Sequence, residues 1–236
     1  MNTYHQELLL EIKQEAKQNP VSSKHTNSYS GTKNYSYPLS NQQRRNIVKR
    51  FIKKHSNISV ETMIELLNSL YESKSYDEKT MAGMILDTVK HLKSQIKPEY
   101  LDVWLNNLEG WSEVDSLCQS KFGAEDFLTY WIDWQKLIKN LAKNNNINKQ
   151  RASLVLLTKP VRDLKNEQFK YLALEVVKKL KDRREILITK AISWLLRDMI
   201  KNYRQEVKNF LILYKDSLPK IAIRETNTKL ATGKKT

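Results

Sequence analysis

The sequence is poor in the residues that build tight turns. Its 236 residues include only five glycines and five prolines. β-Sandwiches and barrels need many turns of this kind. Rossmann and P-loop folds place glycines beside the phosphates that they bind. The composition therefore argues against these classes and predicts helices joined by short polar turns.

Residues that commonly ligate metals are also scarce. The lone cysteine, Cys118, excludes an internal disulfide and a zinc site built on a cysteine cluster. The four histidines lie far apart, and none has another at ligand spacing. They are His5, His25, His55 and His91. We expect no metal and no cofactor.

Long apolar runs are missing as well. No stretch approaches the roughly 20 apolar residues that cross a bilayer. Residues 1–18 have too short an apolar run, and too much charge, for a signal peptide. We therefore expect no membrane association and a soluble, intracellular protein in the cytoplasm.

Positive charge, by contrast, is in excess. There are 41 Lys and Arg against 26 Asp and Glu, a formal charge of +15 with an isoelectric point near 9.7. A surplus of this size favours a polyanionic partner, because neutralising phosphates releases condensed counterions. A generally basic composition without such a partner is the alternative, and charge alone leaves it open.

Apolar residues recur at helical spacing along most of the chain. The pattern predicts helices over 4–18, from 41 through 52, and over 60–71, 76–93, 99–108, 111–122, 125–142, 148–158, 166–180, 184–202 and 205–214, with a short last one near 219–224. Residues 20–41 form the longest segment without this period, too long for an ordinary turn, and are either mobile or functional. The basic tail, 225–236, is expected to be disordered.

About eleven helices of about 10–18 residues, in pairs about 35–45 residues apart, match a stacked solenoid of HEAT-like repeats. We therefore predict an all-α solenoid, with residues 1–224 as a single domain that contains the 20–41 loop. A helical bundle without repeats is the alternative, since no residue-level repeat is visible. A stacked array curves, and a basic concave face would suit a DNA duplex.

Three segments stand out as candidate sites. Trp111 and Asp115 are four residues apart, so on a helix they share one face, although an exposed aspartate on a short helix is the commoner case for this spacing alone. Arg151 stands at the basic start of an apolar helix, where such an arginine usually only solvates the helix end.

The third segment carries Lys190, Trp194 and Arg197 on one side of a helix, opposite an apolar face of Ile188, Ile192 and Leu195. A tryptophan flanked by two cations on a polar face suits contact with a sugar or base together with phosphate.

Together these segments resemble the AlkD-type DNA alkylation repair glycosylases, a family of HEAT-like repeat proteins. The family's tryptophan–three residues–aspartate element resembles Trp111 and Asp115, and its following arginine resembles Arg151. Further likeness spans about residues 25–215, and these residues carry it: Lys190, Ala191, Ile192, Trp194, Leu196 and Arg197; Leu70, Tyr71, Glu78 and Ala82; Tyr29, Gly31, Arg44 and Arg45.

The resemblance implies a monofunctional glycosylase that excises N3- and N7-alkylated purines from double-stranded DNA in base excision repair. It implies catalytic roles for Asp115, Trp111, Trp194 and Arg151. Contacts to DNA are implied for Tyr29, Arg44, Arg45, Lys159, Lys190 and Arg197. Such an enzyme would work as a monomer in a bacterial cytoplasm, associated with the nucleoid when on DNA.

Two other functions remain open. A helical-repeat module could bind damaged or branched DNA without catalysis, but an Asn, Ser or apolar residue at the aspartate position would then be expected. A protein-binding scaffold would present acidic or apolar inner positions, whereas this chain carries +15. The enzyme is the first hypothesis, the DNA-binding module the second and the scaffold the third.

Overall fold

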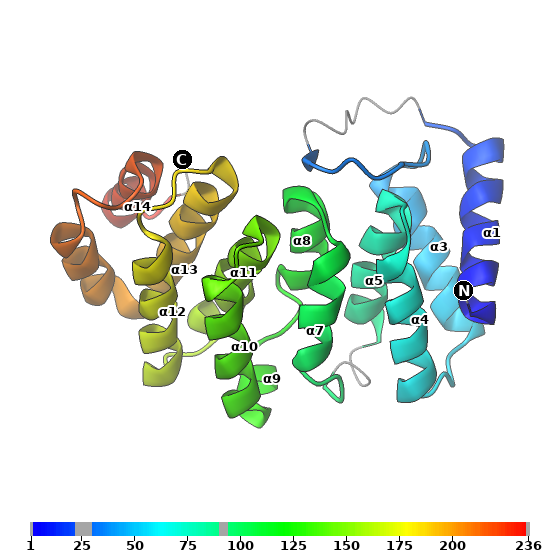
Figure 1. The fold of residues 1–236 in the computed structure, drawn as a ribbon, viewed down its shortest axis with the longest axis horizontal. Helices are drawn as coiled ribbons and strands as arrows, with labels where there is room; N and C mark the ends of the chain where they lie inside the picture. The colour runs from blue at the N-terminus through cyan, green and yellow to red at the C-terminus, as the bar shows by residue number, and fades with distance from the viewer. Residues whose placement is uncertain (1, 22–29, 90–93, 235–236) are drawn as a thin grey trace. The chain divides into compact units, whose positions relative to one another are not determined.

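The structure is a computed structural model that describes residues 2–21, 30–89 and 94–234. Within these ranges it contains twelve α-helices, one 3-10 helix and no strand, so the all-α prediction is confirmed. The helices are α1 (Thr3–Gln18), α3 (Asn41–Lys54), α4 (Val60–Glu72), α5 (Tyr76–Thr88), α7 (Glu99–Trp104), η1 (Leu105–Asn107), α8 (Gly110–Cys118), α9 (Ala124–Thr129), α10 (Trp131–Lys143), α11 (Ile147–Asp163), α12 (Glu167–Leu180), α13 (Ile186–Leu213) and α14 (Lys220–Thr232) (Figure 1).

The described residues group into two compact units, Met1–Leu117 and Cys118–Thr236. In the first unit, α1 packs antiparallel to α3, and polar pairs join their facing sides. Lys54 Nζ lies 2.9 Å from Glu7 Oε1, and Gln43 Nε2 donates to Glu15 Oε1 at 3.1 Å. Helix α5 packs against both α3 and α4. The single domain expected from the sequence stays a prediction.

The second unit has two layers. Helices α11 and α13 pack side by side as one layer, and α10 and α12 form the other (Figure 1). The apolar stripe of α11 is buried in the interior of this unit, where Leu154, Leu157 and Val161 are fully covered. On α13, Ile188, Ile192 and Leu195 are buried as the helical pattern predicted.

One spacing recurs in both units. Hydrogen bonds join residues 36 positions apart in each unit: Trp104 Nε1 to Asn68 at 2.7 Å, Tyr76 to Ser112 at 2.8 Å, Arg151 to the Leu187 carbonyl at 2.7 Å, and Arg162 to Asp198 at 3.2 Å. In a helical array, equivalent positions of neighbouring repeats meet at one repeat length. The helical-repeat architecture is thus visible in contacts, although the residues themselves do not repeat.

Helix boundaries differ from the predicted ones at several points. The predicted helix 125–142 is two helices, α9 and α10, because Tyr130 leaves helical geometry at φ −126°, ψ 47°. Trp134 stabilises the break. Its ring stacks on Phe127 with centroids 4.3 Å apart, and its Nε1 donates to the Asp126 carbonyl.

Helix α11 runs five residues beyond its predicted end. Pro160 lies in its last turn, where the missing N–H costs one backbone hydrogen bond but does not end the helix. Within α13 the predicted break between residues 202 and 205 is confirmed as a kink. Tyr203 has φ −135°, ψ 43°, and helix continues on both sides.

The expectation of a disordered tail from residue 225 is wrong as far as residue 232. Helix α14 continues to Thr232, with Ala222, Thr226 and Leu230 buried at spacings of four residues, and it packs against α13. Gly233, in the left-handed conformation at φ 72°, ends it. Three buried positions are enough to dock a helix whose exposed face is polar.

Candidate active site and nucleic-acid interface

Trp111 and Asp115 lie one turn apart on α8 in the first unit. Trp111 is half-buried, and Asp115 is only 8% exposed. The interpretation of Asp115 as an exposed surface aspartate is therefore wrong. A carboxylate withdrawn from water interacts more strongly with a nearby positive charge than one in bulk solvent.

The start of α8 is fixed by a carboxylate that the sequence analysis missed. Glu113 is fully buried. It accepts hydrogen bonds from Thr32 Oγ1 at 2.5 Å, from Asn34 Nδ2 at 2.9 Å and from the backbone N–H of Glu109 at 2.8 Å. The ammonium of Lys79 lies 3.7 Å away. These partners come from three segments, so Glu113 ties the loop and α5 to the helix that carries Asp115.

Two glycines let the loop reach this helix. Gly31 and Gly110 both have positive φ, 73° and 70°. A Cβ on Gly110 would overlap the backbone of Ser30 and Gly31. This loop was expected to be mobile or functional, and from Ser30 onward it is an ordered support for α8. Tyr29 lies outside the described residues.

A third glycine sets the distance between α5 and α8. A Cβ on Gly83 would overlap the carbonyl of Ser116, one residue beyond Asp115. The two helices therefore approach closely beside the candidate carboxylate.

Arg44 has a structural role and does not fit the predicted DNA contact. It is 4% exposed, its Nε donates to Asp77 Oδ1 at 2.5 Å and its Nη1 donates to Asn41. Its guanidinium also lies over the ring of Tyr76, 5.2 Å from the centroid. Its neighbour Arg45 is exposed.

In the second unit, Arg151 joins α11 to the start of α13. It is 6% exposed, and its Nη1 donates to the Leu187 carbonyl at 2.7 Å. This bond fixes the guanidinium beside the first turn of α13, and the exposed Lys190 begins the next turn. Arg151 and the start of the tryptophan motif are therefore brought together.

Trp194 is positioned by Asp198, which sequence reasoning missed. The half-buried indole donates from Nε1 to Asp198 Oδ2 at 3.0 Å. Asp198 is 8% exposed and also pairs with Arg162 at 3.2 Å and Lys229 at 3.9 Å. The sequence did contain a signal for Asp198, because Trp194 and Asp198 repeat the four-residue spacing of Trp111 and Asp115.

Arg197 departs from its predicted role as a DNA contact. It is 7% exposed, donates from Nε to the Ser193 carbonyl at 3.2 Å, and lies 3.5 Å from Glu225 of α14. Ser193 also donates to Glu225. Helix α14 thus covers part of the face that the sequence predicted to be open, and Arg197 helps to dock it.

Lys159 lies farther along α11. It is half-buried, and its ammonium is 3.6 Å from Asp163. A Cβ on Gly123 would approach the same ammonium, so the lysine packs against the loop before α9.

Burial raises the pKa of the Asp198 carboxyl above its ordinary value, and Arg162 and Lys229 lower it only in part. A carboxyl with a raised pKa in the folded state binds its proton more readily there than in the unfolded chain. Its stabilising contribution is therefore complete at pH values below the pKa in the unfolded chain, about 3.9. It is lost as pH rises through the pKa in the folded state.

Replacing Asp198 with asparagine is expected to remove this pH dependence. The stability of the wild type relative to Asp198→Asn should fall as pH rises from about 4. Urea unfolding of both proteins across this range measures the difference. A difference that stays constant or grows with pH would contradict the assignment.

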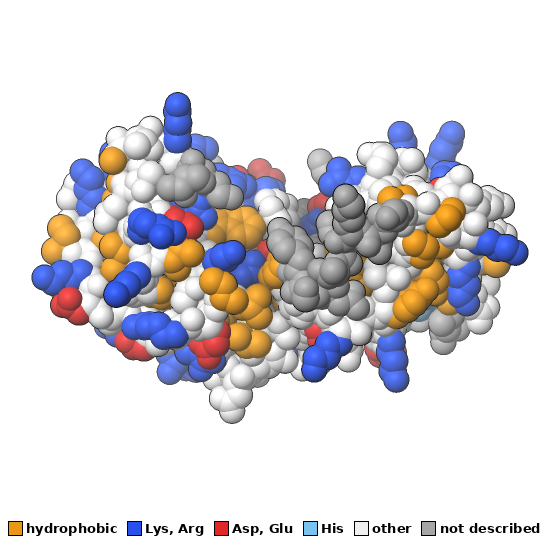
Figure 2. Space-filling view, turned by 90° about the horizontal axis from the view of Figure 1, so that it is seen from above, with side chains coloured by type: hydrophobic (Ala, Val, Ile, Leu, Met, Phe, Trp, Pro, Cys, Tyr) orange, Lys and Arg blue, Asp and Glu red, His pale blue; other side chains and the backbone are white. Residues whose placement is uncertain are grey.

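The chain's positive charge is concentrated in the second unit. Residues 118–236 contain 26 Lys and Arg against 12 Asp and Glu, a net +14, whereas residues 1–117 contain 15 against 14. Lys and Arg side chains appear over both units in Figure 2, together with scattered Asp and Glu. A polyanion is therefore attracted mainly by the second unit.

Among the residues that the structure describes, no three His, Cys, Asp or Glu side chains group closely enough to hold a metal ion. No helix among these residues is both long and apolar enough to cross a membrane.

Comparison with known proteins identifies the family. The sequence pattern of the family described as "DNA alkylation repair enzyme" matches residues 10–230. The fold is similar to the solved structure of a "Predicted DNA alkylation repair enzyme from Enterococcus faecalis". That similarity has a TM-score of 0.69 and 18% sequence identity, over 87% of this chain and 93% of that one. No curated protein matches the sequence.

The chain therefore belongs to the DNA alkylation repair enzyme family. It has a role in the repair of alkylated DNA, and DNA is its partner.

Proposed function

We propose that this chain is a monofunctional DNA glycosylase that hydrolyses the N-glycosidic bond of purines alkylated at N3 or N7. The observation that carries the proposal is the placement of the family's tryptophan–aspartate element. It lies on one face of α8, with Asp115 withdrawn from solvent and the helix start fixed by Glu113.

The chemistry needs little from the protein. An alkyl group on N3 or N7 gives the purine a positive charge, so the base departs neutral without a general acid. The sugar becomes electron-poor, and water must add to it. A carboxylate serves both needs, because it stabilises the developing positive charge and orients or deprotonates the water. Asp115 has this role in the proposal.

The other residues bind and orient the substrate. Trp111, on the first unit, contacts the deoxyribose or the lesion, and Trp194 offers an aromatic surface on the second unit. The ring of either residue attracts a cationic purine. Arg151 contacts a phosphate, with its guanidinium orientation set by the Leu187 carbonyl.

Contacts to the DNA backbone fix register without reading sequence. We assign these contacts to Arg45, Lys159 and Lys190, and keep Tyr29 as a predicted contact. Arg44 and Arg197 are left out, because each is buried in a pair with a carboxylate. A monomer is sufficient for the proposed reaction.

The proposal is tested by incubating the protein with methylated duplex DNA and measuring released 3- and 7-methylpurines by chromatography. We expect release above the spontaneous rate. Release at the background rate alone, with the DNA still bound, would identify a non-catalytic module for damaged DNA instead.

A further inference from the structure

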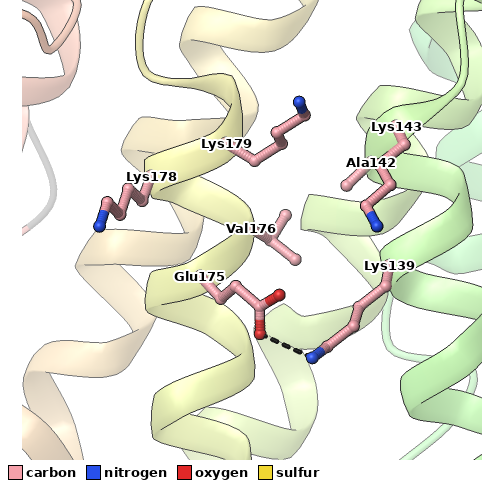
Figure 3. Close-up of a pocket in the computed structure, with 7 residues that line it drawn as sticks. All are labelled: Lys139, Ala142, Lys143, Glu175, Val176, Lys178 and Lys179. Carbon is pink, nitrogen blue, oxygen red and sulfur yellow. Dashed lines mark ion pairs between the residues drawn. The ribbon is translucent and has the colours of Figure 1, made fainter.

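A cavity of about 330 Å³ lies between α10 and α12 in the second unit. Its walls come from facing sides of the two helices (Figure 3). The residues that line it are Lys139, Ala142, Lys143, Glu175, Val176, Lys178 and Lys179. Four of these seven side chains are lysines and one is acidic, so the lining has a net charge of +3.

The lysines that line the cavity differ in whether they form an ion pair. Lys139 Nζ lies 2.9 Å from Glu175 Oε2 and closes one end of the cavity (Figure 3). In the part of the chain that the structure describes, no ion pair involves Lys143, Lys178 or Lys179. All three are exposed. The cavity therefore offers positive charge that no protein carboxylate neutralises.

The lysines also differ in direction. Lys143 extends into the gap between the helices, Lys179 lies across from it, and Lys178 points away from α10 (Figure 3). Ala142 and Val176 are buried and form an apolar floor. A ligand with anionic groups at its rim and a less polar body, such as a sugar–phosphate chain, is complementary to this arrangement.

This cavity is separate from the residues assigned to excision. Arg151 and Trp194 belong to α11 and α13, whereas the cavity is built only by α10 and α12, the other layer of the unit. A duplex bound along α11 and α13 would leave the cavity lysines without a role.

We propose that this cavity, the α10–α12 groove, is a second DNA-binding site, which contacts the phosphates of a duplex other than the one being repaired. The ammonium groups of Lys143 and Lys179 supply the contacts, and lysines suit this task as point charges that read no sequence. DNA is the favoured anion because it is the family's partner and because the second unit carries a net +14. The inference rests on DNA binding and not on Asp115 chemistry.

The test counts duplexes. Undamaged duplexes of one helical turn, about 10 base pairs, are titrated into the full chain by calorimetry at low salt. We expect two duplexes per wild-type chain and one per chain of the double variant Lys143→Glu, Lys179→Glu. Both side chains are exposed, so thermal unfolding should show that the variant keeps its fold.

A matched control carries the same change of net charge elsewhere in the second unit. Lys208 and Lys215 are exposed lysines outside the groove, and the double variant Lys208→Glu, Lys215→Glu should still bind two duplexes. One duplex per wild-type chain, or two on the groove variant, would overturn the proposal.

Two further measurements distinguish DNA binding in the groove from binding of a small phosphate compound and from the excision proposal. Titration with tripolyphosphate asks whether the groove serves a small phosphate compound. Binding of that anion through Lys143 and Lys179, with only one duplex per wild-type chain, would also reject the DNA assignment. Methylpurine release measured on the same preparations shows independently whether the excision proposal holds.

Discussion

Asp115→Asn is expected to slow the release of 3- and 7-methylpurines from methylated duplex DNA by about a thousandfold. A carboxylate ~4 Å from a developing positive charge, at an effective dielectric constant of ~20, stabilises it by about 4 kcal/mol. At 1.36 kcal/mol for each factor of ten, this is roughly three orders of magnitude in rate. Single-turnover kinetics with saturating protein measure the loss.

DNA binding separates this outcome from a structural one. Asparagine has nearly the same shape, so the variant should bind methylated duplex as well as the wild type does. Asp133→Asn, a change of the same kind at an exposed position on α10, is the control and should keep full activity. Loss of binding together with excision would mean that Asp115 supports the fold and does not act on the sugar.

Arg44→Ala is expected to lower the free energy of unfolding by about 3–5 kcal/mol. Removing one partner of a buried ion pair leaves the other charge without compensation, and such losses are typically of this size. The Asp77 side chain that remains is fully buried, and its other donors, the Tyr37 backbone N–H and the Ser36 side chain, carry no charge to replace the guanidinium. Urea unfolding monitored by circular dichroism measures the change.

Arg45→Ala provides the comparison one residue away. Arg45 is exposed, and we expect its replacement to change stability by less than about 0.5 kcal/mol. If Arg45 contacts one phosphate, the slope of log affinity against log salt should fall by about 0.9. The reverse pattern, with Arg44→Ala stable and weak in DNA binding, would restore the DNA contact predicted for Arg44 from the sequence.

Many helix starts could be predicted because their signals are local. Ser59 and Ser75 each accept a hydrogen bond from a backbone N–H three residues later, as N-cap residues do. Apolar spacing then carried each helix forward. These signals depend on neighbours within one turn, and a sequence displays them directly.

The helix breaks and helix extensions could not be predicted from local signals. The interruption at Tyr130 depends on Trp134 stacking on Phe127, which a periodic apolar pattern does not distinguish from a continuous helix. Helix α14 depends on docking against α13, through pairs such as Arg197 with Glu225. A segment stabilised by a partner 28 residues away has only a weak local pattern.

The residues of the candidate site show the same difference between local signals and contacts with distant segments. Asp115 and Trp111 could be selected because their spacing is local and resembles a family element. Glu113 could not, since its role depends on Thr32, 81 residues earlier in the chain. Asp198 is intermediate, because its spacing from Trp194 was visible but its pairing with Arg162 and Lys229 was not.

The uneven charge of the two units has a kinetic consequence. At physiological salt, electrostatic attraction extends over only about 8 Å, so an approaching duplex responds to the nearest unit and not to the net charge of the chain. The +14 unit should therefore capture DNA first, and the nearly neutral unit with Asp115 should engage afterwards. Added salt should then slow association more than it speeds dissociation. Under the proposed function, capture of DNA by the second unit would thus precede the action of Asp115 in the first.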